Sequence, residues 1–178
     1  MSSEALFTGL ILLVGLERVA ELAVSRRNAA WSFERGGVET GQQHFVVMVL
    51  LHSGLLAGAA AEVWIRRPGF APLLAAVMLA AVLASQALRW WCIATLGRRW
   101  NTRVIVIPRL PLVRSGPYRW FSHPNYLAVV VEGVALPLVH TAWITAVVFT
   151  VANAALLRVR IRVEEAALRA AAAADLSS

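Results

Sequence analysis

Side chains able to bind or activate a small molecule concentrate in two short stretches of the chain. The first stretch holds His123, Asn125 and Tyr126, and the second, RVRIRVEE, holds Arg160 and Glu164. Arg160 and Glu164 are four residues apart, so they share one face of a helix. An imidazole, a guanidinium, a carboxylate and an aromatic ring in one cleft would form a small-molecule site. The alternative is a salt-bridged helix end that binds no ligand.

Two apolar segments between these stretches decide whether they meet. The segments run from about residue 124 to 139 and from about 142 to 157, with almost no loop between them. Helices joined so tightly pack antiparallel as a hairpin. The start of the first segment and the end of the second then lie on the same side of the membrane. We therefore expect His123 to face Arg160, Glu164 and Glu165 across one cleft.

The composition indicates an integral membrane protein. Of the 178 residues, 59% are hydrophobic and 15% are charged, against roughly 25% charged in a soluble domain. The mean hydropathy is +0.66. These values exclude an ordinary soluble enzyme and a disordered chain. All 17 basic residues are arginines, and most of them lie between apolar stretches, a pattern that does not predict nucleic acid as a partner.

Five apolar stretches are long enough, or nearly so, to cross a bilayer as helices. They cover about residues 5–24, 44–65, 71–91, 124–139 and 142–157, and the last is expected to continue as a helix beyond the membrane. The sequence therefore predicts one all-α domain over residues 1–178, a polytopic transmembrane helical bundle of about five spans. Residues 1–96 would hold three spans, and residues 97–178 would hold the basic segment, the hairpin and the C-terminal helix.

The arginines predict the orientation of the bundle. Most of them lie between the first two spans, between the third and fourth, and after the fifth, whereas the other side holds only Arg66 and Arg67. Because positive residues stay in the cytoplasm, the N-terminus is expected outside and the C-terminus inside. The chain has Glu4 and no arginine before Arg18, a start that argues against a cleaved signal peptide.

Ionisable residues inside the apolar stretches leave two interpretations open. Glu17, Arg18 and Glu21 interrupt the first span, Glu62 lies near the end of the second, and Glu132 lies in the middle of the fourth. Because a charge inside a membrane is costly, such residues either form internal Glu–Arg pairs or line a wet substrate cavity. Purely structural pairs would favour a non-enzymatic membrane scaffold or a small transporter as the alternative function.

The histidines and the one cysteine predict no metal or haem site. His44 and His52 lie about two turns apart on one helix, and the other spans lack a central histidine that could face them. His140, in the turn between the last two spans, is expected to be exposed. Cys92 cannot form an intrachain disulfide and is expected to be an inert thiol.

A longer pattern connects the two polar stretches. The sequence GPYRWFSHPNYLAVVVE is followed, after the predicted hairpin, by RIRVEEAAL. Together these motifs resemble the isoprenylcysteine carboxyl methyltransferase family of integral membrane methyltransferases, most strongly over residues 110–168. The stretch SRRNAAWSFERGGVETGQQHFVVMVLLH is similar to a bacterial branch of that family. Ser122 stands where the family usually has an arginine, and the chain lacks the family's common Gly-x-x-Tyr-x-x-Tyr tail.

The resemblance implies an S-adenosylmethionine-dependent O-methyltransferase of the bacterial inner membrane. The cofactor would bind at the cytoplasmic face, and a lipophilic or prenylated acceptor would enter from the membrane lipid. Glu164 or Glu165 would hold a polar group of the cofactor, and Arg160 would face the acceptor. The residues expected to contact the cofactor are Leu110, Pro111, Leu112 and Val113 through their backbone, and Tyr118, His123, Pro124, Asn125 and Tyr126.

The chemistry of methyl transfer suits these residue types. Aromatic faces such as Tyr118, Tyr126 or Trp120 can stabilise a sulfonium by cation–π attraction, and Arg160 can hold a carboxylate bidentately. A carboxylate acceptor is ionised at neutral pH, whereas a phenol or pyrone hydroxyl, with a phenolic pKa of about 10, needs a base. The sequence leaves both acceptors open. The catalytic candidates are Arg160, Glu164 and Glu165, with His123 as a further base.

Overall fold

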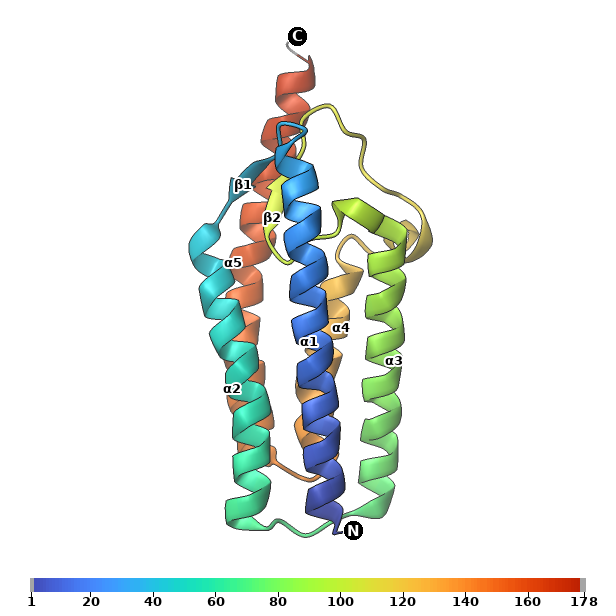
Figure 1. Ribbon diagram of the computed structural model, residues 1–178, viewed down its shortest axis with the longest axis vertical. Helices are drawn as coiled ribbons and strands as arrows, with labels where there is room; N and C mark the ends of the chain where they lie inside the picture. The colour runs from blue at the N-terminus through green and yellow to red at the C-terminus, as the bar shows by residue number, and fades with distance from the viewer. Residues whose placement is uncertain (1, 177–178) are drawn as a thin grey trace.

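The computed structural model describes residues 2–176, which form a bundle of five α-helices (Figure 1). The helices run along the long axis of the molecule. They are α1 (Ser3–Phe33), α2 (Gln42–Arg66), α3 (Pro72–Leu96), α4 (Pro124–Leu138) and α5 (Trp143–Leu176). This arrangement confirms the predicted all-α bundle, its terminal hairpin and the continuation of the last helix. Residues 1, 177 and 178 of the predicted domain lie outside the described part.

Three of the five predicted spans are long and apolar enough to cross a membrane. They cover Gln42–Arg66, Pro72–Arg99 and Trp143–Ala171, and Pro124–Leu138 is a shorter apolar helix. Helices of this length and composition make the chain an integral membrane protein. The first predicted span differs, because Glu17, Arg18 and Glu21 interrupt its apolar run. Helix α1 nevertheless runs along the bundle beside the others (Figure 1).

Helix α1 is longer than the sequence predicted. The apolar stretch ends near Val24, but the helix continues to Phe33, and Gly36, at φ +76°, follows in the turn after it. The predicted span marked only the apolar run. Arginine and alanine, which follow that run, are strong helix formers and carry the helix onward. The extension buries two polar side chains, Ser25 and Asn28, that contact a distant segment.

A short antiparallel ribbon joins the segments that follow α1 and α3. Strand β1 (Val38–Thr40) pairs with β2 (Val104–Val106), and Val38 lies opposite Val106. Strands this short produce no clear periodic pattern, so the sequence did not predict them. The ribbon packs against α5 near the end of the bundle where α1 finishes (Figure 1).

A buried ion-pair cluster connects α1, α3 and α4. Arg89 Nη2 donates to Glu132 Oε2 at 2.7 Å, and Arg89 Nε lies 3.6 Å from Glu21 Oε1. Arg18 Nη1 lies 2.9 Å from Glu21 Oε2. These contacts confirm internal Glu–Arg pairs for Glu21 and Glu132, although Arg89 was not among the predicted partners. Because the opposite charges neutralise each other, the free-energy cost of placing them inside a membrane is lowered.

Glu62 caps a helix and does not line the cavity described below. Its carboxylate accepts hydrogen bonds from the backbone N–H groups of Ile144, at 3.1 Å, and Thr145, at 2.8 Å. A carboxylate at a helix N-terminus satisfies free N–H groups and interacts favourably with the helix dipole. Gly58, one turn earlier on α2, faces Thr145, so the two helices approach closely at this point.

His140 is buried, so the prediction of an exposed turn residue was wrong. The residue is 1% exposed, and its ring centroid lies 5.5 Å from that of Phe7 and 5.3 Å from that of Phe70. Its Nε2 lies 3.1 Å from Ser3 Oγ. The turn is covered by the start of α1 and by the α2–α3 connection, and such long-range packing leaves no mark on the local sequence.

Removing Glu132 should destabilise the bundle strongly, because Arg89 would keep its buried charge without its closest partner. We expect Glu132→Ala to lower the free energy of unfolding by about 3–5 kcal/mol, and Glu132→Gln to lower it less. Chemical unfolding in detergent micelles measures the change. Glu34→Ala is the control, since its pair with Arg35 is exposed. Equal stability of the Glu132→Ala and Glu34→Ala variants would contradict a structural role for the cluster.

Candidate functional site

A cavity of about 1440 Å³ lies inside the bundle, and all five helices contribute to its wall. It extends from the segment after α3 to Thr8 near the start of α1 and to Ala60 on α2. Nearly all the residues predicted to form the site line it, namely Leu110, Pro111, Leu112, Val113, Tyr118, His123, Asn125, Tyr126, Arg160, Glu164 and Glu165. Pro124 is the exception, because it is fully buried in the first turn of α4.

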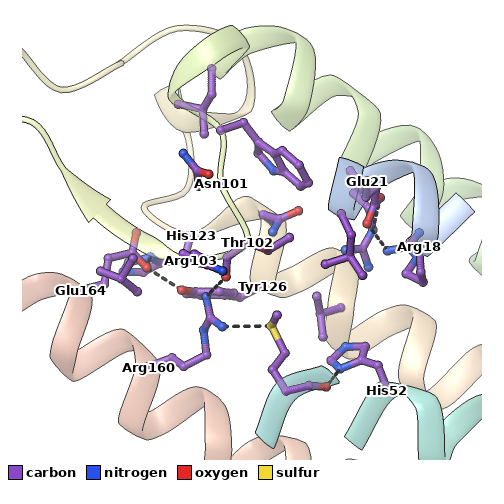
Figure 2. A pocket seen from close by; sticks show the side chains of 18 of the residues that line it. Arg18, Glu21, His52, Asn101, Thr102, Arg103, His123, Tyr126, Arg160 and Glu164 are labelled. Atoms are coloured by element: carbon purple, nitrogen blue, oxygen red, sulfur yellow. Dashed lines mark hydrogen bonds and ion pairs between the residues drawn. The ribbon is translucent and has the colours of Figure 1, made fainter. Parts of the chain in front are cut away.

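The hairpin brings the start of α4 against the far half of α5, as predicted. The rings of His123 and Tyr126 stack with centroids 5.4 Å apart. The Tyr126 hydroxyl donates to Glu164 Oε2 at 2.5 Å, and His123 Nε2 lies 3.6 Å from Glu165 Oε1. The two polar stretches of the sequence therefore form one side of the cavity (Figure 2).

Arg160 is buried, at 5% exposure, and points into the cavity toward Tyr126 (Figure 2). Its Nη2 donates to the Thr102 carbonyl oxygen at 2.8 Å, and its Nη1 lies 2.9 Å from the Met48 sulfur. Its Nε has no hydrogen-bond partner. Among the side chains that the structure describes, no carboxylate forms an ion pair with Arg160. Its contacts are therefore to uncharged groups, and one of these, a thioether, is only a weak acceptor.

The segment before α4 is held against α3 by a glycine and an arginine. Gly116, at φ +56°, lies so close to Thr95 that a side chain would collide with it. Arg99 Nη1 donates to the Pro111 carbonyl oxygen at 2.8 Å and thereby holds the wall formed by residues 110–113.

Burial raises the pKa of Tyr118 well above its usual range, so its hydroxyl stays protonated and neutral at physiological pH.

Polar residues of α1 that the sequence analysis did not select hold the segment after α3. The Thr102 backbone N–H donates to Ser25 Oγ at 3.0 Å, and Asn28 Nδ2 donates to the Trp100 carbonyl oxygen at 2.7 Å. The Thr102 carbonyl then accepts from Arg160. The sequence signal for these contacts was a pair of polar residues, Ser25 and Asn28, in an alanine-rich stretch. They are three residues apart and therefore lie on one face of the helix.

Trp120 does not line the cavity, so its predicted contact with a sulfonium is wrong. Its side chain is 62% exposed, and its ring lies edge-on to Trp91 with centroids 5.7 Å apart. The 3₁₀ turn Gly116–Arg119 directs Tyr118 inward and leaves Trp120 outside.

In the described part of the chain, no three His, Cys, Asp or Glu side chains come together as a metal site.

Comparison of the sequence with known proteins identifies the family of the chain. The sequence model of the isoprenylcysteine carboxyl methyltransferase (ICMT) family matches residues 76–170, more than half of the chain. The chain belongs to this family. The matched region contains α4, most of α5 and the polar side of the cavity that they form. Helices α1 and α2 lie outside the matched residues, so Ser25 and Asn28 contact the matched region from outside it.

Two relatives match most of the chain. The uncharacterized protein YpbQ of Bacillus subtilis (strain 168) is 36% identical over 166 residues, which cover 92% of this chain and 97% of that protein. An uncharacterized protein of Haemophilus influenzae is 25% identical over 152 residues, covering 85% of this chain and 88% of that protein. No solved structure matches the chain.

Removing the Asn28 amide should loosen the segment after α3. Asn28→Ala leaves the Trp100 carbonyl without its donor, which should lower the free energy of unfolding by about 1–3 kcal/mol. Trypsin should then cleave after Arg98 or Arg99 faster than in the wild type. Ser85→Ala is the control, because that buried hydroxyl donates to its own helix. Cleavage at the same rate in the Asn28→Ala and Ser85→Ala variants would contradict the anchoring role.

Proposed function

We propose that the protein is an integral membrane S-adenosylmethionine-dependent O-methyltransferase of a lipophilic acceptor. Membership of the ICMT family supports a membrane methyltransferase. The observation that carries the proposal is the buried guanidinium of Arg160, which contacts only uncharged groups and lies in the same cavity as Tyr126 and Glu164. A guanidinium with a free Nε and a weak thioether contact is available to an anionic oxygen.

The residues around the stacked His123 and Tyr126 rings fit S-adenosylmethionine. When bound, this cofactor supplies an electrophilic methyl group carried on a sulfonium. Tyr126 offers an aromatic face to that positive charge, and Glu164 offers a carboxylate to a hydroxyl or ammonium group. Asn125 Oδ1 is buried in the cavity wall without a hydrogen-bond partner, so it is free to accept from a cofactor N–H group.

The acceptor is a membrane lipid or prenylated molecule that presents a carboxylate or a phenolic hydroxyl. Arg160 holds the acceptor oxygen and neutralises its charge. A carboxylate needs no base, whereas a phenol would lose its proton to His123, Glu164 or Glu165. The Tyr126 hydroxyl already donates to Glu164, and Arg169 Nη2 donates to Glu165 Oε2 at 3.4 Å, so His123 is the least engaged base.

The proposed orientation places this chemistry in the cytoplasm. Arginines are concentrated on the side of the bundle that holds the end of α5 and the segment after α3. Under the positive-inside rule that side faces the cytoplasm, where S-adenosylmethionine is made. The protein then lies in the bacterial inner membrane with its N-terminus outside, and residues 1–178 act as one domain.

A vesicle assay tests activity and orientation together. Labelled S-adenosylmethionine added to inside-out vesicles should label membrane lipid, and mass spectrometry should identify the methylated product. Right-side-out vesicles should give no signal, because the charged cofactor does not cross the bilayer.

Glu164→Ala should weaken cofactor binding measured by calorimetry on purified protein. Absence of both transfer and cofactor binding would reject the enzyme and favour a scaffold or transporter.

Arg160 should matter to the acceptor more than to the cofactor. Arg160→Ala should cost about 2–4 kcal/mol of transition-state stabilisation, as losing one oxyanion donor does, with little change in cofactor affinity. Arg160→Lys keeps the charge but loses the planar fork, so it should restore the rate only in part. Arg162→Ala is the control, since Arg162 is exposed and does not line the cavity. The assigned role is wrong if cofactor affinity falls in proportion to the rate.

A further inference from the structure

Asn153 lies on α5 seven residues before Arg160, and no step of the proposed reaction uses it. The residue is 2% exposed, and it lines the same cavity as Arg160 and Glu164. Its Oδ1 has no hydrogen-bond partner. A buried acceptor left without a donor lowers stability, so such an atom calls for a ligand or a water molecule that donates to it.

The helix period places Asn153 on the cavity face at greater depth than Arg160. Seven residues are close to two turns, so the two side chains leave α5 in nearly the same direction, roughly 10 Å apart along its axis. Leu156 and Leu157 line the cavity between them. A ligand held at Arg160 therefore crosses an apolar stretch before it reaches Asn153.

His52 of α2 and Glu21 of α1 line the same cavity and bring further acceptors to it. His52 Nδ1 lies 2.9 Å from the Met48 carbonyl oxygen. Because a carbonyl only accepts, Nδ1 is the donor, and Nε2 of the neutral ring is an acceptor. Glu21 Oε1 has no hydrogen-bond partner, and the cation that faces it is Arg89 Nε at 3.6 Å. Figure 2 shows His52 and Glu21 across the cavity from Glu164.

The cations at this end already form ion pairs with carboxylates, although Arg18 Nε and Arg89 Nε have no hydrogen-bond partner. Arg18 lies 2.9 Å from Glu21 Oε2, and Arg89 donates to Glu132 at 2.7 Å. An anionic group of a ligand would therefore compete with carboxylates for these arginines. A neutral hydrogen-bond donor meets no such competition, since the buried amide oxygen of Asn153 has no hydrogen-bond partner and His52 Nε2 is an acceptor.

We propose that Asn153, His52 and Glu21 form a second polar subsite that binds a hydroxyl group on the otherwise apolar part of the acceptor. The inference rests on the proposed function, because it takes Arg160 as the place of the acceptor's anionic oxygen. The subsite selects a hydroxylated chain over a plain hydrocarbon chain, since the plain chain leaves buried acceptors unpaired.

Binding of simple probes tests the subsite without methyl transfer. Decanoate presents a carboxylate to Arg160 and an apolar chain to the cavity, and 8-, 9- and 10-hydroxydecanoate add a hydroxyl near the far end. Calorimetry on the purified protein should show at least one hydroxydecanoate binding about tenfold more tightly than decanoate. In Asn153→Leu this preference should disappear, while decanoate affinity stays or rises. Thr150→Val, which removes a hydroxyl that donates to its own helix, should keep the preference.

The outcomes separate this inference from the proposed function. Equal binding of decanoate and every hydroxydecanoate by the wild type would overturn the subsite, and so would a preference that survives in Asn153→Leu. The second result would indicate that the Asn153 amide binds a water molecule instead. That water would lie in the small void of about 50 Å³ that Asn153 also borders, beside Phe149. A preference lost only in Asn153→Leu supports the subsite, even if the vesicle assay finds no methyl transfer and the proposed function fails.

Discussion

A guanidinium that leaves water for the interior of a membrane protein must find charges or hydrogen-bond acceptors there, and this requirement organises the bundle. Arg18 and Arg89 meet it with glutamates of α1 and α4. Contacts between apolar helices in lipid offer little preference for one arrangement, whereas paired ions specify which helices meet and at what depth. The ion-pair cluster therefore determines how α1, α3 and α4 are arranged around the cavity.

Arg160 meets the same requirement in a different way. Its partners are a backbone carbonyl and a thioether, so its position is held while its charge stays available. The carbonyl belongs to Thr102, whose segment is anchored by Ser25 and Asn28 of α1. The part of the chain outside the family match thus helps to place a residue that lies inside it. In this chain the N-terminal helix belongs to the site as well as to the membrane anchor.

The cavity combines two environments along one path. Near the start of α4 and the far half of α5 it presents stacked aromatic rings, an imidazole and carboxylates, which suit a charged, water-borne cofactor. Toward the middle of the bundle it is mostly apolar but keeps unpaired acceptors among the leucines and alanines. A reaction between a polar cofactor and a lipid needs both environments in contact, and Arg160 and Tyr126 lie where they meet (Figure 2).

The sequence alone determined the features that depend on local spacing. The tight connection before α5 implied a hairpin, the helix period put Arg160 and Glu164 on one face, and the motifs identified the family. Tertiary packing decided the rest: Arg89 as the partner of Glu132, the burial of His140, the exclusion of Trp120 and the orphan acceptor of Asn153. Each of these depends on which helix lies opposite. In a chain whose helices are mostly apolar, the local sequence does not show which helix lies opposite, and only the packed bundle settles it.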